Sequence, residues 1–133
     1  MSAAALAVRD TAVMTLPGVP ESVREARALV RRQLGVGPAA EAAALCVSEL
    51  VTNAIVYTRS GLPGGTLAVS LQQVPDGIIV RVRDAGSRVA PVLADPEPGA
   101  EHGRGLLIVA AVADEWGTEP AITGQSTWCR IAA

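Results

Sequence analysis

The sequence contains no lysine, and this absence excludes several classes of enzyme. All of its 11 basic residues are arginine. Pyridoxal enzymes and class I aldolases need a Schiff-base lysine, and a Walker A phosphate-binding loop needs a lysine as well. Aromatic side chains are also scarce, since only Tyr57, Trp116 and Trp128 are present, and the formal net charge is -2. A nucleic-acid-binding protein would have a basic patch and stacking rings, so we do not expect nucleic acid as a partner.

Cysteine and histidine are too few and too widely spaced to indicate a metal centre. Cys46, Cys129 and the single histidine, His102, could in principle form a zinc site, but no CxxC or HxxxH spacing accompanies them. We interpret both thiols as small core side chains in a reducing compartment.

Long apolar runs are absent too. The longest unbroken run, residues 106–113, falls short of the ~20 residues that a membrane span needs. The apolar residues 3–8 have no positive charge before them, so they do not fit a signal peptide. The sequence therefore predicts a cytoplasmic protein with no membrane partner.

The composition fits one domain. Half of the residues are apolar, which is enough to fill a core without disulfides or a structural metal. We expect residues 1–10 to be a loose leader and residues 11–133 to form a single domain. Within this domain, the proline-rich segment at about residues 85–102 has the character of a lid.

Hydrophobic periodicity predicts a strand, two helices, a hairpin, the lid, a third helix and a closing hairpin. The expected bounds are 12–16 for the first strand, 20–34 and 38–58 for the helices, 67–71 and 78–82 for the hairpin, 105–114 for the third helix, and either side of 123–125 for the last two strands. This order is typical of an α+β two-layer sandwich, in which a mixed, mostly antiparallel sheet is covered by about three helices.

The second predicted helix carries polar side chains at a regular spacing. Glu49, Asn53 and Tyr57 are four residues apart, so they share one helical face, while apolar residues occupy the other. This face is either an ordinary solvated surface or a site for a metal and a proton. No arginine lies on it to pair with Glu49, which favours the second interpretation.

A carboxylate ends the second strand of the predicted hairpin. Period-two alternation places Asp84 on the same side as Val80 and Val82, which is the expected core side. A buried carboxylate needs a hydrogen-bond donor. The donor is either a backbone or hydroxyl group of the protein or the exocyclic amine of a purine, and Gly86 would let a flat ring approach closely.

The third motif is a pair of glycines, Gly103 and Gly105, before an apolar helix. A bare helix N-terminus can bind phosphate, although a plain glycine turn is the simpler interpretation. The dinucleotide fingerprint does not fit, since Ile108 occupies the place of its third glycine. Arg104 either adds charge to a phosphate site or faces solvent, and His102 is more typical of a solvated junction. We expect Trp116 and Trp128 to pack in the core or at a sheet edge.

Taken in order, E-L-V-T-N-A at 49–54, D-A-G at 84–86 and G-R-G-L at 103–106 resemble the GHKL ATPase superfamily. The resemblance covers nearly the whole chain and includes the run at 20–27, Trp116-Gly117 and the segment 124–128. It is strongest to the small anti-sigma-factor serine/threonine kinase-like, ATP-binding regulators of actinobacteria. It implies the Bergerat ATP-binding fold.

The resemblance also implies a role for each motif residue. Asn53 would bind Mg²⁺ between the ATP phosphates, and Glu49 would accept a proton from the attacking group. Asp84 would bind the adenine amine, with Gly86 against the ring and Thr127 supporting the adenine site from the last strand. The glycines Gly103 and Gly105 would shape the phosphate seat, with Arg104 as its cation.

Three places depart from the family pattern. The family commonly has histidine where this chain has Tyr57, and Gly-Lys where it has Gly124-Gln125. After Gly86, relatives usually have another glycine or a nearby proline, whereas here the residues 87–90 come before Pro91. The resemblance implies a regulatory kinase that binds a sigma factor and phosphorylates a STAS-type anti-sigma-factor antagonist. A non-catalytic, ATP-dependent protein-binding switch and a degenerate fold without nucleotide are the alternatives, and relatives of this type often form homodimers.

Overall fold

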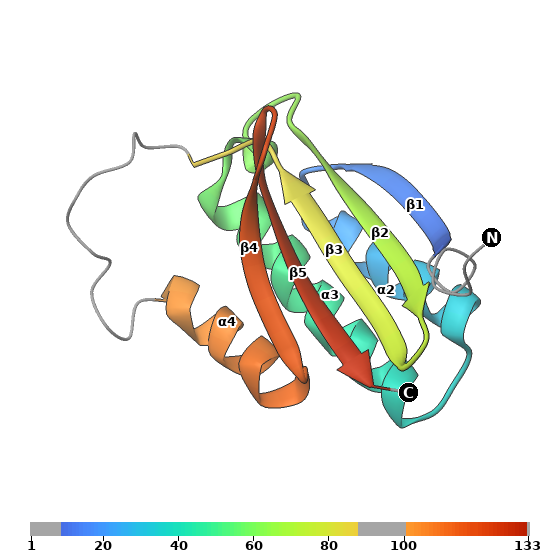
Figure 1. The fold of residues 1–133 in the computed structure, drawn as a ribbon. Helices are drawn as coiled ribbons and strands as arrows, with labels where there is room; N and C mark the ends of the chain where they lie inside the picture. The colour runs from blue at the N-terminus through green and yellow to red at the C-terminus, as the bar shows by residue number, and fades with distance from the viewer. Residues whose placement is uncertain (1–8, 88–100, 133) are drawn as a thin grey trace.

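The computed structural model describes residues 9–87 and 101–132. Residues 1–8 of the expected leader and residues 88–100 of the expected lid lie outside these ranges. The elements run in the predicted order (Figure 1): β1 (Arg9–Pro17), α2 (Glu21–Leu34), α3 (Pro38–Tyr57), the short 3-10 helix η1 (Arg59–Gly61), β2 (Thr66–Val74), β3 (Gly77–Asp84), α4 (Glu101–Val112), β4 (Glu115–Ala121) and β5 (Gly124–Ala132).

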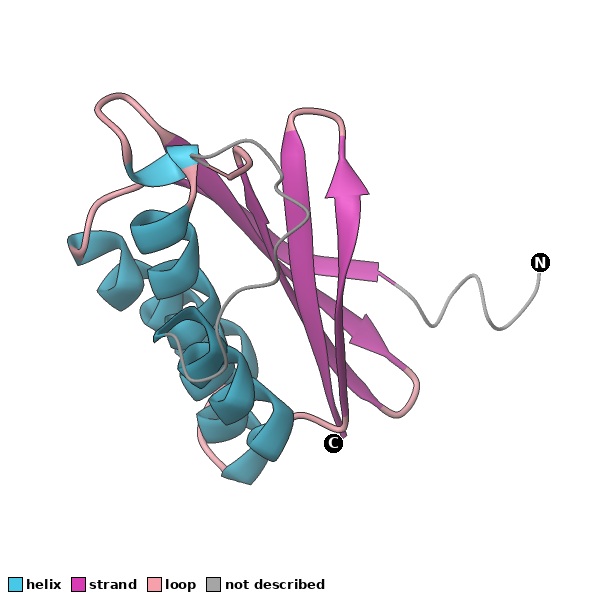
Figure 2. Cartoon of the chain, turned by 90° about the vertical axis from the view of Figure 1, so that its left-hand side faces the viewer, coloured by secondary structure: helices cyan, strands magenta, loops and turns pink. Residues whose placement is uncertain are grey.

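The strands form one sheet in the order β1-β2-β3-β5-β4. Every neighbouring pair is antiparallel, so the described sheet contains no parallel pair. The helices cover one face of the sheet and the strands form the second layer, as Figure 2 shows. This confirms the predicted α+β two-layer sandwich.

The core lies between α3 and the sheet. Helix α3 contacts α2, α4 and β3, and it occupies the middle of the helical layer. By length and composition this helix could cross a membrane. It contains no long unbroken apolar run, because polar residues such as Glu41 and Glu49 interrupt it. Its apolar side chains instead fill the core, where the buried ones are Ala40, Ala43, Ala44, Cys46, Val47, Leu50, Val51 and Ala54.

Both cysteines belong to this core. Cys46 and Cys129 are free thiols and fully buried, as expected for small apolar side chains. Burial and the neighbouring Cys46 raise the pKa of Cys129, so this thiol stays protonated.

Among the predicted starts of the elements, those of β1 and α4 differ most from the structure. Strand β1 begins at Arg9, because its first residues pair with Gln73 and Gln72 of β2, so the expected leader extends two residues too far. Helix α4 begins at Glu101, one turn before the predicted start at Gly105. Glycine disfavours a helix by only about 1 kcal/mol per residue, and the apolar residues later in α4, such as the buried Val109, anchor it on the core.

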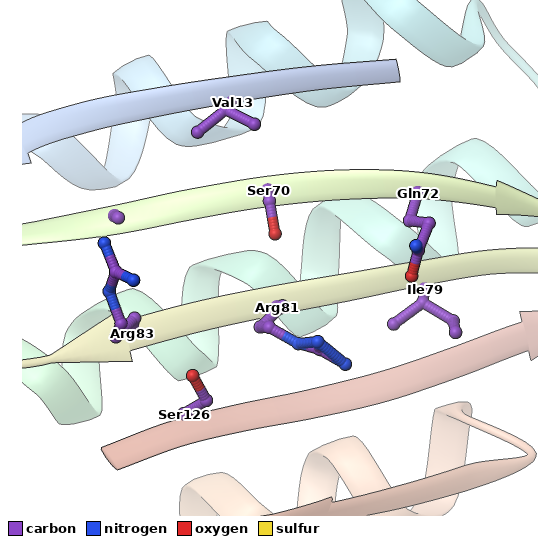
Figure 3. A pocket seen from close by; sticks show the side chains of 8 residues that line it. Val13, Ser70, Gln72, Ile79, Arg81, Arg83 and Ser126 are labelled. Carbon is purple, nitrogen blue, oxygen red and sulfur yellow. The ribbon is translucent and has the colours of Figure 1, made fainter. Parts of the chain in front are cut away.

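The second face of the sheet carries polar side chains. A groove of about 360 Å³ on this face is lined by Arg81, Arg83, Ser70 and their neighbours, which Figure 3 shows across the middle strands. Arg81 pairs with Glu119 at 3.5 Å. This face therefore differs in character from the apolar face beneath the helices.

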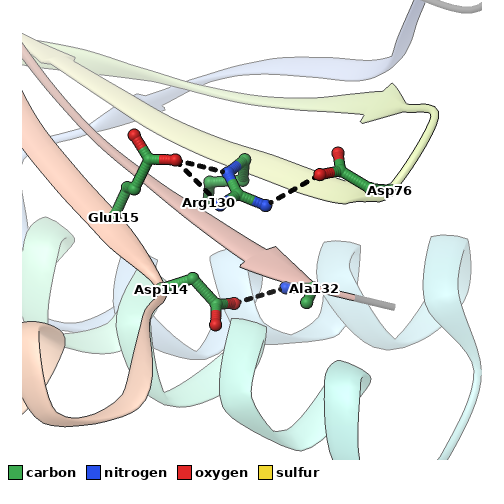
Figure 4. A network of polar contacts seen from close by, with 5 residues as sticks. All are labelled: Asp76, Asp114, Glu115, Arg130 and Ala132. Atoms are coloured by element: carbon green, nitrogen blue, oxygen red, sulfur yellow. Dashed lines mark hydrogen bonds and ion pairs between the residues drawn. The ribbon is translucent and has the colours of Figure 1, made fainter.

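An arginine on β5 ties together the end of the sheet where β3 begins. Arg130 Nη2 lies 2.8 Å from Glu115 Oε1, and its Nη1 lies 3.2 Å from Asp76 Oδ2 (Figure 4). Asp114 Oδ2 accepts a hydrogen bond of 2.7 Å from the Ala132 N–H. These contacts connect the β2–β3 turn, the start of β4 and the end of β5.

Candidate functional site

A cavity of about 630 Å³ opens at the other end of β3, between the helical layer and the sheet. Helices α3 and α4 and the strands β3, β4 and β5 contribute to its walls. Polar and aromatic side chains face it from both layers, among them Asn53, Tyr57, Asp84, Trp116, Gln125 and Thr127. The volume falls within the range that small-molecule sites typically have.

Asp84 reaches this cavity because of the strand period. Val80 and Val82 are buried beneath the helices, and Asp84 follows them on the same face, as the alternation predicted. Burial raises the pKa of the Asp84 carboxyl, while hydrogen bonds from the backbone N–H groups of Gly86 and Gln125 act in the opposite direction. The bond from Gly86 N–H to Asp84 Oδ1 measures 2.7 Å. The carboxylate is therefore fixed in orientation and has capacity to accept a further donor.

Asn53 faces the same cavity from α3. Its Nδ2 atom is buried and has no hydrogen-bond partner among the described residues. An unsatisfied buried polar group costs about 1–3 kcal/mol, so a ligand that supplies a partner here would recover that energy. Leu50 and Ala54 line the wall on either side of Asn53, so the amide stands in apolar surroundings.

Glu49 lies one turn before Asn53 and does not line the cavity. It is half-buried, and no ion pair among the residues described here involves it. The three residues that share the predicted polar face of α3 therefore differ in position. Asn53 and Tyr57 line the cavity, and Glu49 does not. The proton-accepting role of Glu49 remains a prediction.

Thr127 and Gly86 take different places around the cavity. Thr127, opposite Val82 in the sheet, lines the cavity wall, and its support of an adenine site remains a prediction. Gly86 does not line the cavity. Its φ of 95° is a conformation that side chains disfavour, and its N–H holds Asp84. The structure thus gives a backbone reason for glycine here, and contact with a ring remains a prediction.

The predicted phosphate seat needs a correction. Gly103, Arg104 and Gly105 were expected just before a helix N-terminus, but all three lie inside α4. Helix α4 therefore begins before these residues, at Glu101. The side chains of Arg104 and His102 lie outside the described residues, so their contacts with a ligand stay predictions.

Trp116 and Thr118 were missed as cavity residues. Trp116 was expected in the core or at a sheet edge; it lies on the edge strand β4, lines the cavity and is 38% exposed. Both residues lie on β4 two positions apart, so they share one face of the strand. Thr118 pairs with Thr127 of β5, so the face of β4 that carries Trp116 and Thr118 continues the cavity wall beside Thr127.

The donor set fits a nucleotide with magnesium better than a metal bound by protein alone. No group of three or more His, Cys, Asp or Glu side chains gathers in the described part of the chain. Magnesium typically takes one or two protein oxygens and completes its shell with phosphates and water. Asn53 can supply one such oxygen in the cavity, which fits a metal held mainly by oxygens of a ligand.

The comparisons with known proteins identify the family. The model of the histidine kinase-like ATPase domain matches residues 16–131, and the chain belongs to this family. Among solved structures, the chain resembles the RsbU and RsbW domains of Rv1364c from Mycobacterium tuberculosis, with a TM-score of 0.60 and 18% identity. This likeness concerns the fold, and it covers 92% of the present chain and 32% of the other. A search of curated proteins found no match.

Proposed function

We propose that the protein binds Mg²⁺-ATP in this cavity and acts as a regulatory serine/threonine kinase of the anti-sigma-factor type. The observation that carries the proposal is that Asn53, whose Nδ2 has no partner among the described residues, and the oriented carboxylate of Asp84 face one cavity. Membership of a histidine kinase-like ATPase family makes ATP the expected ligand.

Asp84 recognises the base in this proposal. Its carboxylate accepts a hydrogen bond from the exocyclic amine of adenine, and Gly86 N–H keeps Oδ1 in place. Thr127 supports the carboxylate from the neighbouring strand, while Trp116 and Leu106 supply apolar surface. A bound amine also compensates the desolvation that raises the pKa of Asp84.

Asn53 acts at the phosphate end. Its amide oxygen would hold Mg²⁺, which would neutralise charge on the ATP phosphates and so activate the γ-phosphoryl group for transfer. We also propose that Gly103 and Gly105 give the backbone of α4 access to the phosphates and that Arg104 adds positive charge. The absence of lysine leaves arginine as the available cation.

Glu49 is the proposed proton acceptor. The hydroxyl oxygen of a serine or threonine on the partner forms a bond to the γ-phosphorus, the bond from that phosphorus to the β–γ bridging oxygen breaks, and ADP leaves. A Glu49 carboxylate oxygen takes the hydroxyl proton. We propose that the phosphorylated partner is a STAS-type anti-sigma-factor antagonist. The second proposed partner is a sigma factor, which this protein binds. We propose that the protein binds both partners in the cytoplasm. A homodimer is compatible with this role.

The kinase proposal is tested by incubation with γ-labelled Mg²⁺-ATP and a STAS-type antagonist. We expect wild type to label the antagonist, and Glu49→Gln to retain ATP binding but label it about 10²- to 10⁴-fold more slowly, which is the usual contribution of a general base. Glu41→Gln is the matched control, because Glu41 lies in the first turn of the same helix. Equal labelling by wild type and Glu49→Gln would contradict the assigned role.

A second candidate function is a non-catalytic switch, in which ATP changes the affinity for a protein partner without phosphoryl transfer. It is favoured by the position of Glu49 outside the cavity lining. Calorimetry that shows ATP-dependent partner binding, together with no labelling of any partner, would support the switch over the kinase.

A further inference from the structure

The chain that follows α3 is hydrogen-bonded to the chain that follows β3. Ser60 Oγ accepts a bond of 2.9 Å from Ala85 N–H. Next to it, Arg59 N–H donates to the Gly86 carbonyl oxygen at 2.8 Å, and Thr58 forms an isolated β-bridge with Ser87. These contacts join the segments that continue from Asn53 and from Asp84.

Thr58 extends this connection into the helix. Its hydroxyl donates to the carbonyl oxygen of Ala54 at 2.6 Å and accepts from Ser60 N–H at 3.0 Å. Ala54 is the residue after Asn53 on α3. A continuous series of hydrogen bonds therefore runs from the last turn of α3, through Thr58 and Ser60, to Ala85.

The turn that carries these hydroxyls is closely packed. Ser60 is fully buried. A Cβ atom at Gly18 or at Gly65 would overlap the Ser60 carbonyl oxygen, so two glycines allow the surrounding chain to approach this turn. With backbone on these sides, the turn has little room to shift.

We propose that Thr58 and Ser60 are positioning residues of the nucleotide site. They fix the Ala85-Gly86 segment to the end of α3, and Gly86 N–H in turn orients the Asp84 carboxylate. The two hydroxyls thereby set the distance between the carboxylate that recognises the base and the amide that binds the metal. This inference rests on the proposed function, because it concerns how the cavity distinguishes its ligand.

The consequence is a base preference that depends on residues outside the base contact. ATP offers the exocyclic amine to Asp84, whereas inosine triphosphate (ITP) carries an oxygen at the same position. A correctly placed carboxylate therefore favours ATP. When the Ala85-Gly86 segment is released, Asp84 loses its fixed orientation and ATP loses its advantage, while contacts to the phosphates persist.

The experiment measures Mg²⁺-ATP and Mg²⁺-ITP affinities by calorimetry, with thermal unfolding of each variant. Thr58→Val removes the hydroxyl and keeps the shape, and Thr58→Ser keeps the hydroxyl. Ser60→Ala removes the acceptor of Ala85 N–H. We expect Thr58→Val and Ser60→Ala to weaken ATP binding by about tenfold with little change for ITP, as loss of a contact to a charged group would. Thr58→Ser should restore the preference.

Two variants control for a general loss of stability. Ser22→Ala removes another buried serine, whose hydroxyl donates to the Pro17 carbonyl oxygen at 2.6 Å. Ser48→Ala removes a hydroxyl that bonds the carbonyl four residues earlier on α3, at 2.8 Å, as Thr58 does. Both should lower the midpoint of thermal unfolding and leave the ATP-to-ITP ratio at the wild-type value.

A double-variant cycle shows whether the hydroxyl acts through Asp84. If it does, Ser60→Ala should add little further loss of ATP affinity to an Asp84→Ala protein, because the coupled contact is already absent. If Ser60→Ala does not fold, Thr58→Val combined with Asp84→Ala decides the point. Additive losses would overturn the proposal.

Failure of this inference is distinguishable from failure of the proposed function. If Asp84→Ala reduces ATP binding and Thr58→Val leaves the ATP-to-ITP ratio unchanged, the positioning role is wrong and the ATP site stands. If wild type binds neither nucleotide, the proposed function itself is wrong.

Discussion

Asn53 and Asp84 belong to different layers of the fold and face one cavity. Asn53 stands on α3, where its Nδ2 has no partner among the described residues, and Asp84 ends β3, where Gly86 N–H holds its carboxylate. An amide and a carboxylate on opposing elements can bind two parts of one ligand. This relationship is the basis of the predictions below.

Removal of the Asn53 amide should abolish the effect of magnesium on nucleotide binding. Wild type should bind ATP more tightly with Mg²⁺ than with a chelator, because Asn53 would hold the metal and the metal would offset the phosphate charge. In Asn53→Ala the two affinities should be nearly equal. Calorimetry in Mg²⁺ and in chelator measures both, with Thr52→Ala, an exposed neighbour on the same helix, as the control. Retained magnesium dependence in Asn53→Ala would rule out this role.

ATP affinity should fall on acidification. In the proposed site the ionised Asp84 carboxylate accepts a hydrogen bond from the adenine amine, and burial raises the pKa of this carboxyl above its ordinary value of 3.8. Binding should therefore weaken as pH falls from neutral through the raised pKa. Affinities measured across this range should show the loss in wild type, whereas the weaker binding of Asp84→Asn should lack this titration.

The free energy of unfolding should also depend on the protonation of Asp84, and it should change with pH in the direction opposite to the ATP affinity. Because the pKa of Asp84 is higher in the folded than in the unfolded chain, the folded state holds the proton more tightly. Its contribution to the free energy of unfolding thus increases as pH falls through the folded pKa, and it is lost as pH rises. At neutral pH, Asp84→Asn should unfold at the same temperature as wild type or higher. A clear decrease would contradict the desolvation argument.

Gly124 should be required for nucleotide binding because it lets the chain approach the backbone of the Asp84 segment closely. A Cβ atom there would overlap the Asp84 carbonyl oxygen and lie 2.7 Å from Gly86 N. Gly124→Ala should displace the Asp84 segment and weaken ATP binding by about tenfold or more. Gly77→Ala is matched to it, because its Cβ would overlap the Ile131 carbonyl oxygen at the opposite end of β3. Both variants should unfold at a lower temperature than wild type. Among the molecules that remain folded, only those of Gly124→Ala should bind ATP more weakly than wild type.

Local patterns were sufficient to predict much of this site. Helical spacing placed Asn53 and Tyr57 on one face, and strand alternation placed Asp84 inward, because both depend only on the period of a regular element. The start of α4 could not be predicted from its glycines, since tertiary packing outweighs their small helix penalty. The Ser60 turn was also invisible in the sequence, because its hydrogen bond joins residues 25 positions apart. Trp116 was missed because the sequence of β4 does not indicate which face of the strand is covered, and none of its residues is buried.

The most direct test of the account is calorimetric titration of Mg²⁺-ATP into wild type and Asp84→Ala. We predict saturable binding to wild type, and binding about 10- to 100-fold weaker to Asp84→Ala, which is the range for a hydrogen bond to a charged group. Equal affinities in two folded proteins, or no binding to wild type, would contradict the assignment of this cavity to ATP.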